Sequence, residues 1–479
     1  MSLDAFISQI EKNKAALVAR LAEAVAIPSV SGDAKYRKHV FEMADWMKAQ
    51  LEKLGATASF QPLGKQMLNG EEIDLPPVIF ADLRAKTDAD KKKTILVYGH
   101  FDVQPALKSD GWDTEPFELV HDEKTGRLYG RGSTDDKGPI LGWLNVIEAH
   151  QQIGLDLPVN LKFCFEGMEE SGSVGLDECI YKNKDGFFQG VDACCISDNY
   201  WLGTKKPCIT HGLRGVTYFK LHISGPGADL HSGLFGGVVH EPMTDLFQIM
   251  SRLVTPQGEI LVPGIKELVA PLTDEERKRY EVMEFTIKDM DDATGSSTTI
   301  SDEKESVLMA RMRYPSLSLH GIEGAFSAPG TKTVIPAKVV GKFSIRLVPN
   351  MTPKAVSDLV VDYVNKEWAK IGSKNKMVIE GDPDGGKPWY ADPNHWNYAA
   401  ATKATEKIYG VKPDLTREGG SIPVALTFSE VTGKNLLLLP LGRADDGAHS
   451  APEKLDLDNY LRGTQLLGVY LHEVAASKA

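Results

Sequence analysis

Cysteine is scarce in this sequence. Only five of the 479 residues are cysteine, and none stands in a CxxC pair or at the Cys/His spacing of a zinc finger. An odd count without such spacing argues against a disulfide framework and against a structural zinc site. We therefore expect reduced, mostly buried thiols. The N-terminal segment mixes charges into its apolar positions and so lacks the apolar core of a signal peptide, which predicts a cytosolic protein.

Long apolar runs and an excess of positive charge are also missing. No segment approaches the roughly 20 consecutive apolar residues that a membrane helix needs. The formal net charge is −12, from 54 basic and 66 acidic side chains, which argues against nucleic acid or an anionic membrane as the main partner. The length exceeds the roughly 250–300 residues at which a single core stops growing, so we expect two domains.

Several catalytic motifs are absent as well. The sequence contains no GxxxxGK[ST], no GxSxG and no HExxH, and GRGSTDDKG has an acid where a GxGxxG loop needs its last glycine. A P-loop nucleotide site, a serine-hydrolase elbow and a helix-borne zinc protease site are therefore not indicated.

Four compact apolar runs are present, and each is followed by histidine or acidic residues. The runs are residues 95–98, 160–165, 191–196 and 436–439. They are typical of buried strands in an α/β sheet, with amphipathic helices predicted over 3–21, 40–54 and 139–150. The predicted fold class is therefore α/β, with a mixed sheet flanked by helices.

The pattern changes between about residues 214 and 388. We predict a βαββαβ order with a charged insertion near 256–313, which is the ferredoxin-like α+β arrangement. Its elements are a strand at 216–224, a helix at 241–254, strands at 317–321 and 339–348, a helix at 353–371 and a strand at 376–380. Because the run at 436–439 follows this unit, we expect it to be inserted: 1–213 and 389–479 form one domain, and 214–388 the other.

Histidines and acids follow the four runs in a regular way. In order along the chain they are His100 and Asp102, then Glu169 and Glu170, then Asp198, then Asp445, Asp446 and His449. Ligands of open α/β sheets bind outside the carboxyl ends of the strands, so we expect these groups to converge at one edge. Asp135 and Asp136, just before the helix predicted over 139–150, can join them.

So many carboxylates in one crevice need cations to neutralise them. Two histidines with several acids and no thiolate suit zinc or manganese, and a pair of metals sharing one carboxylate is the simplest interpretation. Taken singly, a histidine at a strand end is usually structural, and adjacent acids are usually solvated or cap helices. The recurrence after four separate runs is what favours a metal site.

Seven motifs then carry a resemblance over essentially the whole chain: GHFDVQP, GRGSTDDKGP, EGMEESGS, CISDNYWLG, DLHSG, TREGGSIP and ADDGAHS. In this order they resemble the di-metal aminopeptidase-like hydrolases of the aminoacylase and carnosinase type. The resemblance implies a di-metal catalytic domain with an inserted lid and dimerisation domain. It also implies a cytoplasmic metallodipeptidase acting on short peptides such as Cys-Gly. An N-acyl amino-acid deacylase and a non-catalytic scaffold on the same fold are the alternatives.

The resemblance also implies site roles. Two divalent ions per subunit, zinc or manganese, would be bound by five residues: His100, Asp135, Glu170, Asp198 and His449. Asp135 would bridge the ions, with His100 and Asp198 completing one set and Glu170 and His449 the other. Asp102 would orient His100. Glu169 would be the general base that generates a metal-bridging hydroxide.

Substrate-binding residues are implied in the same way. Arg346 would bind the C-terminal carboxylate of the peptide, with Thr333, Gly420 and Ser421 near its backbone. His231 would reach into the site of a neighbouring subunit, which requires at least a homodimer. The ordinary alternatives are a surface charge on a strand for Arg346 and a turn residue for His231.

Overall fold

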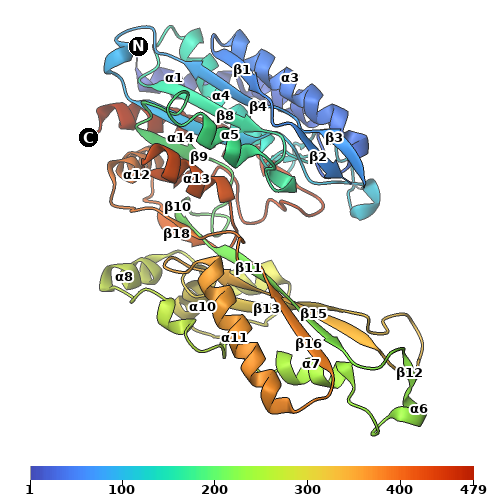
Figure 1. The fold of residues 1–479 in the computed structure, drawn as a ribbon. Helices are drawn as coiled ribbons and strands as arrows, with labels where there is room; N and C mark the ends of the chain where they lie inside the picture. Colours follow the sequence, from blue (N-terminus) through green and yellow to red (C-terminus); the bar gives the residue numbers. More distant parts are fainter. Residues whose placement is uncertain (1, 69, 479) are drawn as a thin grey trace.

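A nine-stranded sheet forms the larger of two bodies in the computed structural model, which describes residues 2–68 and 70–478 (Figure 1). Its strand order is β1-β4-β8-β5-β9-β19-β10-β17, with β18 beside β10. The strands are Thr57–Gln61 (β1), Val78–Leu83 (β4), Thr94–His100 (β5), Asn160–Glu166 (β8), Ala193–Ile196 (β9), Cys208–Leu213 (β10), Trp389–Tyr390 (β17), Asp414–Glu418 (β18) and Leu436–Leu438 (β19).

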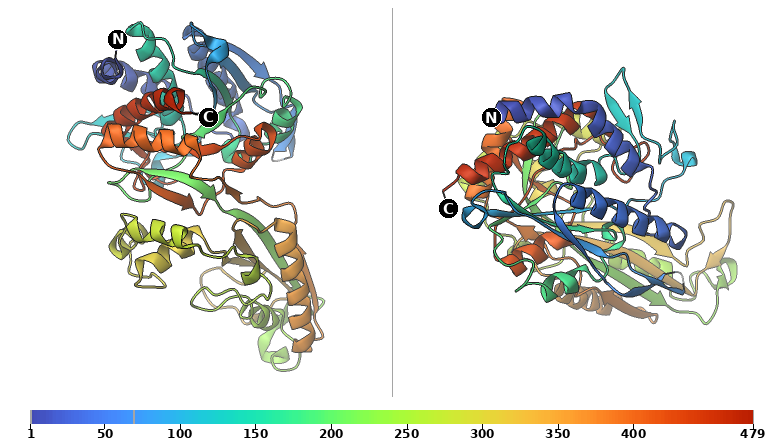
Figure 2. Two further views of the ribbon diagram at one scale, coloured as in Figure 1. Left: turned by 90° about the vertical axis from the view of Figure 1, so that its left-hand side faces the viewer. Right: turned by 90° about the horizontal axis from the view of Figure 1, so that it is seen from above.

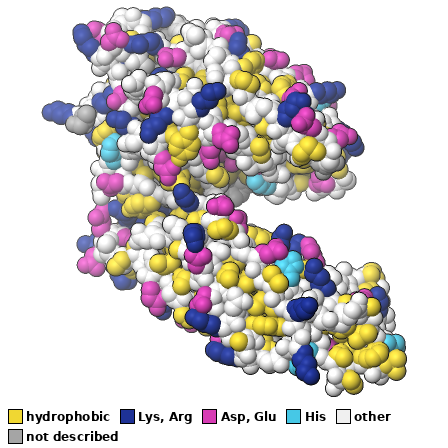
Figure 3. Space-filling view, in the orientation of Figure 1, with side chains coloured by type: hydrophobic (Ala, Val, Ile, Leu, Met, Phe, Trp, Pro, Cys, Tyr) yellow, Lys and Arg dark blue, Asp and Glu magenta, His cyan; other side chains and the backbone are white. Residues whose placement is uncertain are grey.

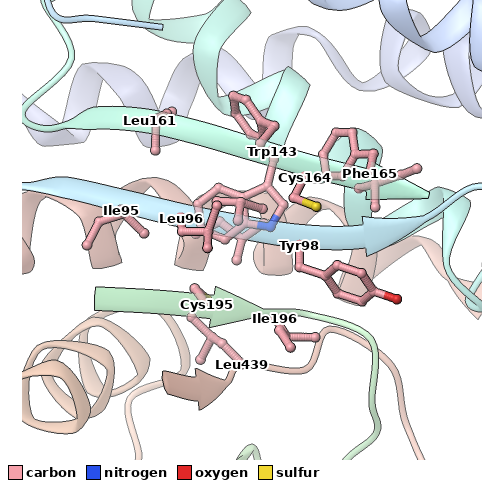
Figure 4. Close-up of a cluster of buried hydrophobic side chains, with 14 of the residues drawn as sticks. Ile95, Leu96, Tyr98, Trp143, Leu161, Cys164, Phe165, Cys195, Ile196 and Leu439 are labelled. Atoms are coloured by element: carbon pink, nitrogen blue, oxygen red, sulfur yellow. The ribbon is translucent and has the colours of Figure 1, made fainter. Parts of the chain in front are cut away.

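The four apolar runs of the sequence are the four neighbouring strands β8, β5, β9 and β19. They are parallel to one another, so their carboxyl ends lie at one edge. Helices cover both faces of these strands, which is why their side chains are almost all buried (Figure 4). Tyr98 of β5 packs on Phe428, and Trp143 packs on Tyr470 within a helical layer.

Eight helices of the described chain surround this sheet: Leu3–Lys12 (α1), Lys14–Val25 (α2), Arg37–Lys53 (α3), Lys137–Gln152 (α4), Leu176–Lys182 (α5), Trp396–Tyr409 (α12), Pro423–Thr432 (α13) and Leu457–Ala476 (α14). Helices α1, α2, α4, α12 and α14 contact one another, and α5 contacts α13. The single helix predicted over 3–21 is wrong, because Asn13 separates α1 from α2. The Asn13 side chain accepts from Gln9 and donates to Gln152 of α4.

The smaller body is a four-stranded antiparallel sheet of order β13-β15-β11-β16. Its strands are Gly215–Ser224 (β11), Ser316–Glu323 (β13), Lys338–Leu347 (β15) and Lys376–Gly381 (β16), and its helices are Pro242–Met250 (α7) and Pro353–Ile371 (α11). Both helices pack on the sheet and enclose a separate hydrophobic core (Figure 2). The predicted ferredoxin-like arrangement, and with it the fold class, is confirmed.

The charged insertion contains three helices, Asp274–Val282 (α8), Ile287–Thr294 (α9) and Lys304–Met312 (α10). They bury Tyr280 and Met312 against Trp201 of the larger body. Glu276 of α8 joins Arg417 of β18, 2.8 Å away, and Arg313 of the insertion, 3.2 Å away. The insertion therefore bridges the two bodies. The exact domain boundaries, 1–213 with 389–479 and 214–388, stay a prediction.

Across residues 2–68 and 70–478, the structure contains no helix with the length and apolar character needed to cross a membrane.

Candidate metal centre

The histidines and acids that follow the parallel strands meet at their carboxyl edge. His100 is the last residue of β5, Glu169 and Glu170 form a short turn of 3-10 helix after β8, and Asp198 follows β9 by two residues. His449 lies on the loop after β19, and Asp135 lies in the turn before α4. Parallel strands bring these loops together because they all end on the same side of the sheet.

Two groups of possible metal ligands share Asp135. In the first, Nε2 of His100 lies 3.2 Å from Oδ1 of Asp135 and 3.5 Å from Oδ2 of Asp198. In the second, Nε2 of His449 lies 3.2 Å from Oδ2 of Asp135 and 2.9 Å from Oε2 of Glu170. Within each group the ligand atoms lie within 4.8 Å of one another. One imidazole and two carboxylates per group fit a divalent ion such as zinc or manganese.

Asp102 contacts both His100 and the turn that carries Glu169 and Glu170. It is fully buried, and its Oδ1 lies 3.3 Å from Nδ1 of His100. Its two oxygens also accept the backbone N–H groups of Glu169 and Glu170 at 3.2 and 3.1 Å. These contacts join the His100 imidazole to the Glu169–Glu170 turn through one carboxylate, an arrangement that suits a residue behind a metal ligand.

Electrostatics in the cluster are strongly perturbed. Burial raises the pKa of Glu169 far above its ordinary value, and the neighbouring charges of Asp198 and Asp102 add to this effect. Burial also raises the pKa of Asp198. Hydrogen bonds to Asp135 and Glu170 raise the pKa of His449 to about 10. The buried carboxylates thus repel one another, and bound divalent cations would reduce this repulsion.

Asp445 and Asp446 do not join this cluster, contrary to the expectation that all acids after the fourth run converge. Nζ of Lys454 lies 2.9 Å from Asp445 and 2.6 Å from Asp446, and it also bonds Asp456. An ammonium group thus occupies the place that a cation would take among these three acids. Asp136 lies closer to the centre, where its Oδ2 accepts the backbone N–H of His100 at 3.1 Å.

The predicted substrate-binding residues fall into two groups within one chain. Arg346 of β15 lies with Nη1 3.5 Å from Oγ of Ser421, next to Gly420. His231 and Thr333 lie together elsewhere, because the N–H of Ser232 donates to the carbonyl of Thr333 at 3.1 Å. His231 ends Leu230–His231 (β12), and Thr333 directly precedes Val334–Ile335 (β14). These two strands pair at the end of the smaller body farthest from the large sheet (Figure 1).

A cavity of about 680 Å³ adjoins the metal-ligand loops. Its lining includes Tyr200, two residues after Asp198, and Ala448, which directly precedes His449. Glu418 lines it from β18, and Asp289 and Arg311 line it from the insertion. The insertion thus forms one wall of this cavity. The sequence analysis did not single out these residues; the only available signal was that Tyr200, Glu418 and Ala448 stand inside three of the motifs.

The fold and the shared-carboxylate centre together point to a metal-dependent hydrolase, with a ferredoxin-like unit whose strands lie in the chain between β10 and β17 of the large sheet. Comparison with known proteins identifies the family: residues 96–473 match the model of peptidase family M20/M25/M40, and the chain belongs to this family. It is 52% identical over 476 residues to the Cys-Gly metallodipeptidase dug1 of Schizosaccharomyces pombe, covering 99% of each chain.

Two further comparisons agree over the full length. The chain is 44% identical over 476 residues to the human Beta-Ala-His dipeptidase, covering 99% of this chain and 93% of the relative. The solved structure of the di-peptidase Dug1p from Saccharomyces cerevisiae superposes with a TM-score of 0.88 at 51% identity, covering 100% of this chain and 99% of the other. The family resemblance predicted from the sequence motifs is confirmed.

Proposed function

We propose that this protein hydrolyses dipeptides of the Cys-Gly type with two divalent cations, zinc or manganese. Its class as a metallodipeptidase is confirmed by the family match and by relatives more than 50% identical over the whole chain. The observation that carries the two-ion proposal is Asp135, whose two oxygens face different histidine-carboxylate groups. His100 and Asp198 would hold one ion, and Glu170 and His449 the other.

Bound at these positions, the cations would polarise the scissile carbonyl and make a water molecule more acidic. Glu169 is proposed as the general base. Its Oε2 lies 4.0 Å from Nε2 of His100, so its carboxylate faces the centre. A carboxylate at this position can take a proton from the attacking water and then give it to the leaving amine.

Separate substitutions of Glu169 and Glu170 test whether the first is the base and the second a metal ligand. Glu169→Gln removes the base, and we expect kcat to fall by about 10²–10⁴ while both metals stay bound. Glu170→Gln serves as the matched comparison, because it removes a proposed ligand and should lower metal content. Near-normal turnover by metal-loaded Glu169→Gln would refute the assignment of Glu169.

Two arginines favour a substrate with a free C-terminal carboxylate. Burial and the nearby charge of Arg346 lower the pKa of Arg214 to about 10. A carboxylate placed beside both guanidinium groups would relieve their repulsion, and Ser421 and Gly420 lie at the same place. Kinetics with Cys-Gly, with carnosine and with an N-acetyl amino acid, after loading with each metal, test this proposal. Faster hydrolysis of the N-acetyl compound would favour the deacylase instead.

We also propose a homodimer in which His231 and Thr333 serve the partner's site. The β12–β14 ribbon that carries them lies far from the carboxyl edge of the large sheet, where the proposed metal ligands of the same chain lie (Figure 1). Next to them, Leu234 and Val238 are 73% and 76% exposed, and apolar side chains gather at this end of the molecule (Figure 3). Such an exposed apolar cluster is typical of a protein interface.

Mixing two inactive variants tests the shared site. His231→Ala and Glu169→Gln should each be nearly inactive alone, but a mixed dimer contains one site with an intact Glu169 and a partner's intact His231. We expect activity to return after the two are unfolded and refolded together. Failure of activity to return in verified mixed dimers would refute the exchange.

A cytosolic location remains a proposal as well. It is supported by the five cysteines, which are all buried free thiols in the structure. Cell fractionation with an antibody against the native chain tests it.

A further inference from the structure

A buried carboxylate outside the proposed ligand groups lies directly beneath the loop that carries Asp135. Glu453 is fully buried and lies four residues after His449, immediately before Lys454–Asp456 (β20). It is separated from the Asp135 loop by more than 300 residues of sequence. A charged side chain is rarely buried unless its bonding capacity is satisfied, so the partners of Glu453 indicate its purpose.

Four donors surround this carboxylate. Oε1 accepts the backbone N–H groups of Thr134 and Asp135 at 2.9 and 3.1 Å. Oε2 accepts the backbone N–H of Gly132 at 2.9 Å and Nη1 of Arg131 at 2.8 Å. These four bonds fill the acceptor capacity of a carboxylate. Three of them hold the backbone of the loop itself, one of them at Asp135.

The same loop and the His449 segment are joined at two more points. The Thr134 hydroxyl donates a hydrogen bond to Oδ2 of Asp446 at 2.7 Å. Nη2 of Arg131 donates to the carbonyl of Ser450 at 3.1 Å. These contacts lie on either side of His449, whose own backbone has a φ of 59°, an unusual conformation for a residue other than glycine. The segment from Asp446 to Glu453 is thus held against the Asp135 loop on both sides of its histidine.

We propose that Glu453 is a positioning residue for the metal centre, tying the shared ligand Asp135 to the segment that carries His449. These two residues come from distant parts of the chain and must meet within a few tenths of an ångström to bind one ion. A carboxylate bonded to the backbone of one loop and covalently part of the other sets their separation directly. The inference depends on the proposed two-metal function.

Glu453→Gln tests the proposal. A side-chain amide has only one acceptor oxygen, so in either orientation its NH₂ group faces backbone N–H groups or Arg131 and leaves donors without a partner. We expect Mn²⁺ to bind 10- to 100-fold more weakly, measured by titration of the metal-free protein with detection of free Mn²⁺. We also expect kcat at limiting Mn²⁺ to fall and to recover at high Mn²⁺, with little change in KM.

Glu276→Gln is the matched control, because Glu276 of the insertion is also a buried glutamate paired with arginine, here Arg417 of β18 and Arg313. It should lose thermal stability yet bind Mn²⁺ like the unaltered protein. A Glu453→Gln protein that loses stability but keeps Mn²⁺ affinity would show a merely structural role and overturn the proposal. If the unaltered protein itself binds neither Mn²⁺ nor Zn²⁺, the two-metal function fails instead.

Thr134→Val provides a milder test should Glu453→Gln not fold. It removes only the hydroxyl that bonds Asp446 and leaves the backbone bonds to Glu453 in place. We expect Mn²⁺ affinity to fall several-fold in the folded protein. If the affinity is unchanged, the contact between the Asp135 loop and the His449 segment does not determine metal binding.

Discussion

Adding one methyl group at Gly99 should damage both the core and the metal centre. Gly99 precedes His100 in β5, and a Cβ at this position would lie 2.2 Å from Cγ2 of Ile140 in α4 and 2.6 Å from Oδ2 of Asp136. Ordinary carbon contacts are about 3.5–4.0 Å. Ile140 is 1% exposed and cannot move into solvent, so Gly99→Ala must push α4 away from β5.

The magnitude follows from the two contacts. Overpacking of a dense core costs about 1–3 kcal/mol of unfolding free energy. Displacement of Asp136 also removes the acceptor of the His100 backbone N–H, a bond of 3.1 Å. Because His100 is a proposed ligand whose orientation depends on such contacts, we expect metal affinity to fall by about 10- to 100-fold.

A double-mutant cycle tests whether Gly99→Ala destabilises the protein through its clash with Ile140. Ile140→Ala alone should cost about 2–5 kcal/mol through the cavity that it leaves. Combined with Gly99→Ala, the new methyl group occupies part of that cavity, so the double variant should be at least about 1 kcal/mol more stable in urea denaturation than additivity predicts. Strict additivity would refute the clash.

Gly468→Ala is the control for function. A Cβ at Gly468 of α14 would lie 2.1 Å from Cζ of Phe6 in α1, a comparable clash between two helices that carry none of the proposed metal ligands. This variant should lose stability and keep its metal affinity. If Gly99→Ala also keeps its metal affinity, the reasoning through Asp136 is wrong.

Three further predictions concern pH, substrate binding and metal removal. Burial and the proximity of His150 lower the pKa of His472 to about 4, so its neutral form is favoured in the folded state. Stability should therefore be complete above about pH 6.5 and decrease as pH falls toward 4, by roughly 2 kcal/mol after allowance for partial exposure; a His472→Gln protein that keeps this pH dependence in urea titrations would contradict the prediction. Arg346→Lys keeps the charge but loses the planar fork, so KM for Cys-Gly should rise about tenfold with kcat changed little; an unchanged KM would argue against Arg346 as the carboxylate ligand. Chelation should lower the melting temperature, and Zn²⁺ or Mn²⁺ at about 100 times its Kd should restore roughly 2.7 kcal/mol for each ion; identical melting curves with and without metal would exclude coupling of these ions to folding.

The amino-acid sequence by itself determined the elements that form the centre. Four apolar runs became four adjacent parallel strands because only a strand buried on both faces tolerates such continuous apolar composition. Since parallel strands end at one edge, the loops that carry these histidines and acids had to lie along that edge. The order of strands and helices in the smaller body was likewise readable from periodicity and confirmed by its sheet order.

Only the tertiary structure decided which acids face the centre and which do not. Asp445 and Asp446 follow the same run as His449, yet both form ion pairs with Lys454 and do not join the ligand groups. Glu453 carried no signal in the sequence, because its partners at Gly132, Thr134 and Asp135 lie more than 300 residues away. Local patterns determine strands and helices, whereas the direction and partner of a charged side chain depend on contacts that exist only after distant segments pack together.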